Sequence, residues 1–162
     1  MNIDKFWRIV QDVHKSANGD MDDKCKRMTT TIGALAADEA TSFAAHFENA
    51  MQEAYSWPLW GAAYVIHGGC GDDSFSDFRA SLISRGRVQF EAALANPDSL
   101  ADIDLSEDDW VYEGFSYAVT DGVKLAGAKR DARMIPSSNP AGQEWAEDAV
   151  YSLFPRLAAK YG

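Results

Sequence analysis

The sequence predicts an all-α protein, folded as a single compact domain of seven or eight helices over residues 1–162. Apolar residues recur at three- and four-residue spacing along most of the chain, which is the pattern of amphipathic helices. No stretch alternates apolar and polar residues at period two, so strands are not expected. No long linker divides the chain, and 162 residues with 46% hydrophobic content are enough for one core.

Two helices are expected near the N-terminus. The first begins after Asn2, a residue type that caps helices, and ends at Asn18-Gly19, which favours the left-handed conformation of a helix end. The second covers about Asp20 to Leu35 and has a weaker apolar face, since three consecutive threonines and Gly33 lower its helix propensity. The apolar stripe of the first helix consists of Ile3, Phe6, Trp7, Val10 and Val13.

The stretch from Ser56 to Arg87 is the apolar centre of the sequence and follows a third helix that starts near Asp38. Ser56 is expected to cap a helix from Trp57 to Ile66, which is apolar nearly all round and therefore buried on several sides. Glycines then stop this helix, and Asp72 or Asp73 is expected to cap the next one. The inward side chains of that next helix are predicted to be Phe75, Phe78, Leu82 and Ile83.

Further helices are predicted in the C-terminal half. One continues after Gly86 to the turn signal Asn96-Pro97, with Val88, Phe90 and Leu94 on its inner face. Ser106, followed by Asp109 three residues later, resembles a capping box for a helix that runs to about Lys129. Its inward residues are predicted as Trp110, Val111, Phe115, Ala118, Val119 and Leu125. A loop over 136–140 and a last helix from about Gln143, carrying Trp145, complete the prediction.

The charge balance narrows the choice of partner. A net charge of −10, from 25 acids against 15 bases, repels phosphate backbones and anionic lipid, so neither nucleic acid nor a membrane is expected as a partner. A basic protein or a cationic ligand would suit this surface, and the charge also serves solubility. Seven acids and no base lie between Asp98 and Glu113. The candidates there for contacting a partner are Asp102, Asp104, Glu107, Asp108 and Asp109.

The cysteine content and the N-terminus predict a cytoplasmic protein. Cys25 and Cys70 are too few for a disulfide framework and fit a reducing compartment. The opening residues, MNIDKFWRIVQDV, are amphipathic and charged, unlike a signal peptide. No run of about eighteen apolar residues exists that would span a membrane.

The loop from His67 to Asp73 is the strongest candidate for a site, and several interpretations of it stay open. Its glycines and aspartates fit a corner in which one helix ends and the next begins. Cys70 near a helix N-terminus could instead be a nucleophile, with a histidine as its base. His67 and Cys70 are spaced as half of a zinc site, but the chain has no second pair. Asp72 and Asp73 could supply oxygen ligands to a hard cation.

Neither a metal nor a cofactor is predicted. No Walker loop, dinucleotide fingerprint, nucleophile elbow or HExxH motif is present. The acids from Asp102 to Glu113 approach an EF-hand pattern, but Glu107 stands where that loop requires glycine.

The remaining interpretation of the loop is an internal ion-pair network. Arg79 is expected to bind a carboxylate in a bidentate manner, whereas Arg85 and Arg87 are expected to be exposed and available to a ligand. The carboxylates considered as partners of Arg79 are Asp72, Asp73, Asp77 and Glu113.

Aromatic residues are concentrated in two regions. Their spacing places most of them in the core, while one or two could line a groove, since tyrosine and tryptophan are frequent at binding surfaces. The set comprises Trp57, Trp60, Tyr64, Trp110, Tyr112, Phe115 and Tyr117.

Several segments together carry a resemblance to a known family. The longest are LWGAAYVIHGGCGDDSFSDFRASLISRGRVQFEAAL and NPDSLADI, and IDKFWRIV, YEGFSYA, NPAGQEW and FPRLAAKYG accompany them. They resemble an uncharacterised bacterial family, domain of unknown function 4240, over nearly the whole chain. The chain departs from the family pattern at Ser81, where tryptophan is expected, and at Gly71, where serine is expected. The resemblance implies the fold and its extent, and no activity.

Two classes of function follow. The first is a non-catalytic intracellular module, of the immunity or antitoxin type, that binds a basic protein through an acidic and aromatic surface. The second is a small enzyme or ligand-binding domain with its site at the Gly68–Asp73 loop. In that case Cys70, Asp72, Asp73, Arg79 and Glu113 would converge on one cleft, with Arg79 or Arg87 holding an anion. A structural module that works as a dimer is a third option.

Overall fold

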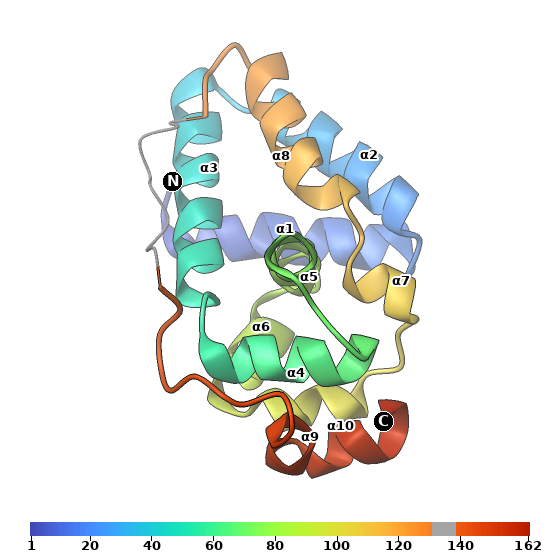
Figure 1. The fold of residues 1–162 in the computed structure, drawn as a ribbon. Helices are drawn as coiled ribbons and strands as arrows, with labels where there is room; N and C mark the ends of the chain where they lie inside the picture. The colour runs from blue at the N-terminus through green and yellow to red at the C-terminus, as the bar shows by residue number, and fades with distance from the viewer. Residues whose placement is uncertain (131–138) are drawn as a thin grey trace.

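The computed structural model describes residues 1–130 and 139–162, and these residues form helices, with a longer non-helical stretch before Val150 and without a β-strand (Figure 1). The all-α prediction is confirmed. Eight of the described α-helices have seven or more residues, in agreement with the predicted number. The elements are α1 (Ile3–Ala17), α2 (Met21–Gly33), α3 (Ala37–Glu53), α4 (Trp57–His67), α5 (Asp72–Ile83), α6 (Arg87–Ala95), the 3-10 helix η1 (Pro97–Asp102), α7 (Glu107–Trp110), α8 (Gly114–Leu125), α9 (Val150–Leu153) and α10 (Pro155–Tyr161).

Side-chain caps fix the starts of α1, α2 and α4. Asn2, Asp20 and Ser56 each accept a hydrogen bond from the backbone N–H three residues further on, at 2.8, 2.9 and 3.3 Å. Each cap satisfies an N–H group that the helix itself leaves unpaired. α1 ends at Asn18, whose φ of 49° is left-handed. The predicted caps Asn2 and Ser56 and the predicted end of α1 are therefore confirmed.

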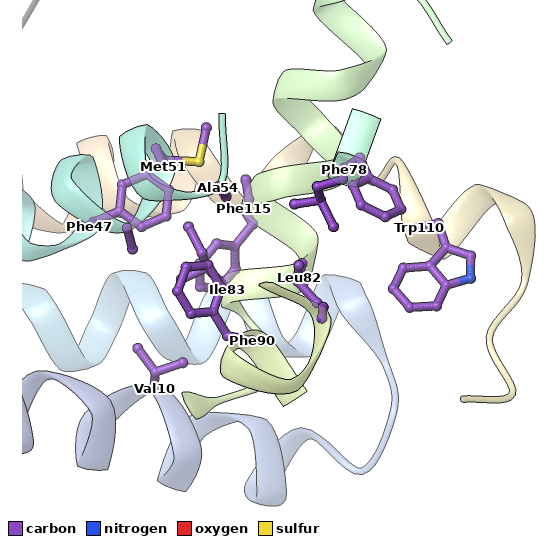
Figure 2. Close-up of a cluster of buried hydrophobic side chains, with 14 of the residues drawn as sticks. Val10, Phe47, Met51, Ala54, Phe78, Leu82, Ile83, Phe90, Trp110 and Phe115 are labelled. Carbon is purple, nitrogen blue, oxygen red and sulfur yellow. The ribbon is translucent and has the colours of Figure 1, made fainter. Parts of the chain in front are cut away.

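Helix α5 passes through the middle of the fold and is surrounded by the other long helices (Figure 1). Seven of the nine residues from Phe75 to Ile83 are buried, because α5 contacts α3, α4, α6, α7 and α8. Phe78 stacks on Trp110 of α7 with the ring centroids 5.4 Å apart, and Figure 2 shows Leu82 and Ile83 among side chains from other helices. The inward side chains predicted for this helix are confirmed.

Helices α2 and α8 lie side by side and run parallel (Figure 1). Gly114, Ala118 and Gly122 recur every four residues on the face of α8 that meets α2, and small residues allow two helix backbones to approach closely. A Cβ at Gly122 would lie 2.7 Å from the Cβ of Ile32. Thr29 Oγ1 donates a hydrogen bond to the Ala118 carbonyl at 3.1 Å. This stripe of small residues fixes the position of α8 on α2.

Two residues expected in the core are exposed. Val88 is 79% exposed, because the short helix α6 buries Phe90 and Ala93 and turns Val88 to its outer side. Leu125 is 66% exposed at the end of α8, where its side chain packs over Gly33, which has no Cβ. The expectation that both face inward was wrong.

The helix predicted from Trp110 to about Lys129 is divided. α7 ends at Trp110, Val111 has a non-helical ψ of 36°, and α8 begins at Gly114, where a Cβ would lie 2.7 Å from the Tyr112 ring. The predicted N-cap is confirmed, since Ser106 Oγ accepts the Asp109 N–H at 3.2 Å.

The last helix begins later than predicted. Residues 143–149 are not helical, because tertiary contacts hold this segment against α4. The Trp145 indole donates to the Trp57 carbonyl at 2.7 Å, and the Ala141 carbonyl accepts the Trp57 N–H at 2.8 Å. Helix α9 starts only at Val150, and α10 follows from Pro155. Most of the predicted loop over 136–140 lies outside the described residues.

A continuous hydrophobic cluster joins α1 to α10 and includes residues of η1 and of the short helices α7 and α9. Among the helices of residues 1–130 and 139–162, none combines the length and the apolar character that crossing a bilayer requires.

Candidate functional site

The glycine loop between α4 and α5 is a corner between two helices. Gly68 has a φ of 66° and ends α4, and its neighbour Gly69 has a φ of 138°. Both values lie in the region that favours glycine. An added Cβ at either position, or at Gly71, would meet nothing within 4 Å, so these glycines serve the backbone conformation and not a close approach.

The expected aspartate cap of α5 was wrong. The N-cap residue is Gly71, which has no side-chain cap, and Asp72 and Asp73 occupy the first turn. Acidic side chains there complement the positive end of the helix dipole, which explains their position without a ligand.

Cys70 is not placed as a nucleophile. Its thiol is half-buried and lies 3.7 Å from the Gly71 carbonyl, and its own carbonyl accepts a hydrogen bond from the Trp60 indole at 2.8 Å. Burial, with a smaller contribution from the negative charge of Asp77, raises the pKa of the Cys70 thiol to about 11. The thiolate fraction is therefore very small at neutral pH. Within the described residues, no three His, Cys, Asp or Glu side chains come together as metal ligands.

Arg79 does not form the predicted ion pair with a described carboxylate. Its guanidinium donates to the carbonyl of Met51 at 2.8 Å and, from Nε, to that of Phe75 at 3.4 Å. It also lies over the rings of Tyr55 and Phe75, 4.6 and 4.9 Å from their centroids. Because the Met51 carbonyl belongs to the last turn of α3, Arg79 caps that helix from α5. Burial lowers the pKa of Arg79, which Tyr55 and Asp72 partly offset.

Arg87 is not free for a ligand. It bridges α6 to α1, with one nitrogen 3.0 Å from Asp4 and another 2.7 Å from Glu91. The neighbouring Arg85 is half-buried and donates to Gln89. The predicted exposure is therefore wrong for Arg85, whereas the side chain of Arg87 is 43% exposed and already has two carboxylate partners at the surface.

The first half of the acidic segment serves α10. The side chain of Asp98 accepts the backbone N–H groups of Arg156 and Leu157 at 3.2 and 2.9 Å, and so caps that helix. Asp102 pairs with Arg156, and Asp104 pairs with Lys160 at 2.8 Å. Asp98 is therefore used as a helix cap, and Asp102 and Asp104 each have a basic partner within the chain.

The second half of the acidic segment lies on and after α7. Asp108 is exposed and Asp109 is half-buried, with no ion pair to another described residue. Glu107 is the first residue of α7, and its side chain is not among those that the structure describes.

A hollow of about 390 Å³ brings together Asp73 and Glu113 from the predicted set. It lies between the first turns of α5 and α8, and Asp77 is the third carboxylate in its lining. Burial raises the pKa of Asp77, and the charges of Glu113 and Asp73 raise it further. The remaining lining residues are Ser76, Ser116 and Tyr117, so no base faces these acids from within the lining. We call this site the acidic hollow.

The predicted convergence of residues on one cleft is correct only in part. Cys70, Asp72 and Arg79 do not line the acidic hollow. Tyr117 does, and it is the member of the aromatic set that is 62% exposed, whereas Trp110 and Phe115 are buried. Asp77 had been considered only as a partner for Arg79. Its spacing of four residues from Asp73 on one helix face was the available signal.

The chain belongs to the family described as Protein of unknown function (DUF4240), whose match covers residues 1–123. This confirms the resemblance found in the sequence, and the matched part contains every residue that lines the acidic hollow. The two segments NPAGQEW and FPRLAAKYG lie beyond the matched residues. No curated protein and no solved structure matches the chain.

Proposed function

We propose that this member of the family is a non-catalytic binding module that recognises a basic protein through the acidic hollow. The observation that carries the proposal is the set of three carboxylates, Asp73, Asp77 and Glu113, in a lining without lysine, arginine or histidine. Three acids elsewhere on the described surface, Asp4, Asp23 and Glu39, have a basic partner, whereas Asp38 and Glu144 are single exposed acids that do not line this hollow.

The charges of the acidic hollow favour a cation. Asp77 is half-buried, and burial, followed by the negative charges of Glu113 and Asp73, raises its pKa. An arginine or lysine side chain from a partner would relieve this repulsion and form charge-assisted hydrogen bonds, each contributing about 1.5–3 kcal/mol. The exposed ring of Tyr117 adds a face for a cation–π contact.

The geometry supports binding more than catalysis. The hydroxyl groups that line the acidic hollow, Ser76, Ser116 and Tyr117, have no histidine or lysine beside them in that lining to act as a base. At the Gly68–Asp73 loop, the alternative site, the thiol of Cys70 has a raised pKa, and the arginines expected to hold an anion are engaged elsewhere. An immunity-type role, in which a basic protein is neutralised, is one form that such binding would take.

The test compares three forms of the full chain as baits in a pull-down from the native host at low salt. The double variant Asp77→Asn, Glu113→Gln removes two charges from the acidic hollow. The matched control Asp38→Asn, Glu144→Gln removes two charges from exposed positions elsewhere. We expect a basic protein that high salt releases, that the control retains and that the hollow variant loses, with the affinities then measured calorimetrically on the purified pair. Equal retention by both variants, or recovery of no basic protein, would refute the proposal.

A further inference from the structure

A buried ammonium group lies where the start of α2 meets the end of α5. Lys24 is 1% exposed, and its Nζ donates to Oγ of Ser84, the C-cap residue of α5, at 3.1 Å. Ser84 in turn donates to the Ser81 carbonyl at 2.6 Å. An ammonium group has three N–H donors, so two donors of Lys24 have no hydrogen-bond partner among the described residues.

His14, in the last turn of α1, gives an independent observation. Its Nδ1 atom is buried and has no hydrogen-bond partner among the described residues. Unpaired buried polar atoms are rare in folded proteins, and an ion or a water molecule that pairs with them is a usual explanation. Both α1 and α2 therefore carry a buried nitrogen group whose hydrogen-bonding capacity the chain itself does not use.

These nitrogen groups belong to one cluster. The positive charges of Lys24 and Arg85 both lower the pKa of His14, after burial as the largest cause. The charge of Arg85 also lowers the pKa of Lys24, again after burial. The side chain of Gln11, one turn before His14 on α1, lies directly against Gly86, the residue after Arg85. We call the cluster of His14, Lys24 and Arg85 the basic junction.

The acids near the basic junction do not neutralise it. Arg85 donates to Gln89, and neither Arg85 nor Lys24 forms an ion pair with a described carboxylate. Asp109 raises the pKa of both cations from beyond ion-pair distance, and Cys25 raises that of Lys24. Burial, as the main cause, raises the pKa of the Cys25 thiol to about 11, so this thiol is neutral at pH 7. Two positive charges thus share one distant negative charge.

The enclosure of the basic junction determines which counter-ion suits it. Buried charges in proteins are normally paired, and attraction is strong where water does not screen it. An anion must lose its water of hydration to reach Lys24. That loss costs less for a monovalent anion of low charge density, such as chloride or bromide, than for fluoride or a phosphate dianion.

We propose that the basic junction binds a small monovalent inorganic anion of the chloride class. The anion accepts hydrogen bonds from the two remaining donors of Lys24 and from Nδ1–H of His14. It supplies the missing counter-charge and connects the end of α1 and the start of α2 to the turn between α5 and α6. The proposal does not depend on the acidic hollow, so either site can fail its test without the other.

The test measures the pKa of His14 by NMR titration of the full-length protein in sodium gluconate, a salt of a large organic anion. Chloride, bromide or fluoride then replaces gluconate at constant ionic strength, with His46 and His67 as internal references. Lys24→Met removes the ammonium group, and Lys26→Met, at an exposed lysine of the same helix, is the matched control. Urea unfolding at pH 7 in the same salts is a second readout, which needs no acid titration and verifies that each variant is folded.

We expect chloride and bromide to raise the pKa of His14 by at least about one pH unit in the wild type and in Lys26→Met, because a nearby negative charge favours the imidazolium. Fluoride should have a much smaller effect, and Lys24→Met should lose the response. The urea midpoint of the wild type should rise with chloride in parallel.

Two results would overturn the proposal. If neither the pKa of His14 nor the urea midpoint differs between gluconate and chloride, water is the partner of these groups. If Lys24→Met responds to chloride as the wild type does, or if His46 shifts as much as His14, the effect is general screening and not a site.

Discussion

Replacement of Lys24 by methionine is expected to stabilise the protein at neutral pH, because the ammonium group of this lysine is buried without a counter-charge. Lys24 is 1% exposed, and its Nζ donates to Ser84 Oγ at 3.1 Å. No ion pair joins it to another described residue. Burial, and secondly the positive charge of Arg85, lower its pKa from 10.5 to about 8, although Cys25 and Asp109 act in the opposite direction.

The magnitude follows from the size of this pKa change. Each unit corresponds to 1.36 kcal/mol, so the buried charge costs about 3 kcal/mol at pH 7. Methionine keeps the apolar stem and loses the hydrogen bond to Ser84, which contributes about 1–2 kcal/mol. Ser84 Oγ still donates to the Ser81 carbonyl, at 2.6 Å, and so is not left unpaired. We expect the Lys24→Met variant to be more stable by about 1–2 kcal/mol at pH 7.

The pH dependence gives a sharper test than the sign at one pH. Since the pKa of Lys24 is lower in the folded protein, the unfolded chain binds more protons between pH 8 and 10.5, and the wild type gains stability as pH rises through that window. The variant lacks this gain, so the difference in unfolding free energy should move by about 2.5 kcal/mol in favour of the wild type between pH 7 and pH 10, and the variant should become the less stable of the two at pH 10. Urea unfolding followed by circular dichroism at both pH values measures it. Lys26→Met, at an exposed lysine on the same helix, is the control and should show no such change.

The reasoning fails if Lys24→Met is less stable than the wild type at pH 7 and the difference does not change at pH 10. That result would mean that the Lys24 ammonium is solvated or paired in solution, and that its burial carries no net cost.

Three further predictions concern other buried groups. Burial raises the thiol pKa of both Cys25 and Cys70 to about 11. Their alkylation by iodoacetamide at pH 7.5, measured by mass spectrometry, should therefore be at least tenfold slower than that of glutathione. Unfolding in urea should remove this difference. Gly122→Ala should cost about 1–3 kcal/mol in urea unfolding, since the added methyl overlaps α2, whereas Gly71→Ala, in open space, should change stability by less than about 0.5 kcal/mol. Burial, followed by the positive charges of Lys24 and Arg85, lowers the pKa of His14 to about 4. The unfolded chain therefore binds a proton at a higher pH than the folded protein does, and the free energy of unfolding should fall as the pH drops from 6.5 towards 4. His14→Leu should flatten that slope in urea midpoints measured at pH 7 and pH 5.

The features that sequence predicted correctly depend on residues a few positions apart. Asn2 and Ser56 cap helices because the N–H groups they accept are three residues away, whatever the rest of the chain does. The inward face of α5 was also predictable, since Phe75, Phe78 and Leu82 follow helical spacing. The helix-corner interpretation of the glycine loop succeeded for the same reason, because the left-handed φ of Gly68 is a local requirement.

The features that sequence could not predict are choices among distant partners. The sequence offers four carboxylates as candidate partners of Arg79. The guanidinium instead donates to the carbonyl of Met51, 28 residues away, because the end of α3 packs against α5. Trp145 lies on an apolar stripe that predicts a helix, but its indole donates to Trp57, 88 residues away, and this contact holds the segment in a non-helical conformation. The spacing of apolar residues predicts which face of a helix is buried, but it does not predict which other helix or segment packs against that face.

The same long-range packing decides which acids are available to a partner. The acidic segment is the predicted binding surface because it contains no base, but α10 packs against it and supplies Arg156 and Lys160 to Asp102 and Asp104. An external cation at Asp102 or Asp104 must compete with a base of the same chain, although each such exposed ion pair contributes only about 0–1 kcal/mol. Asp73, Asp77 and Glu113 have no such base in their lining. Electrostatic steering of a basic partner should therefore be weakened more by charge removal at the acidic hollow than by the same change at the α10 contacts.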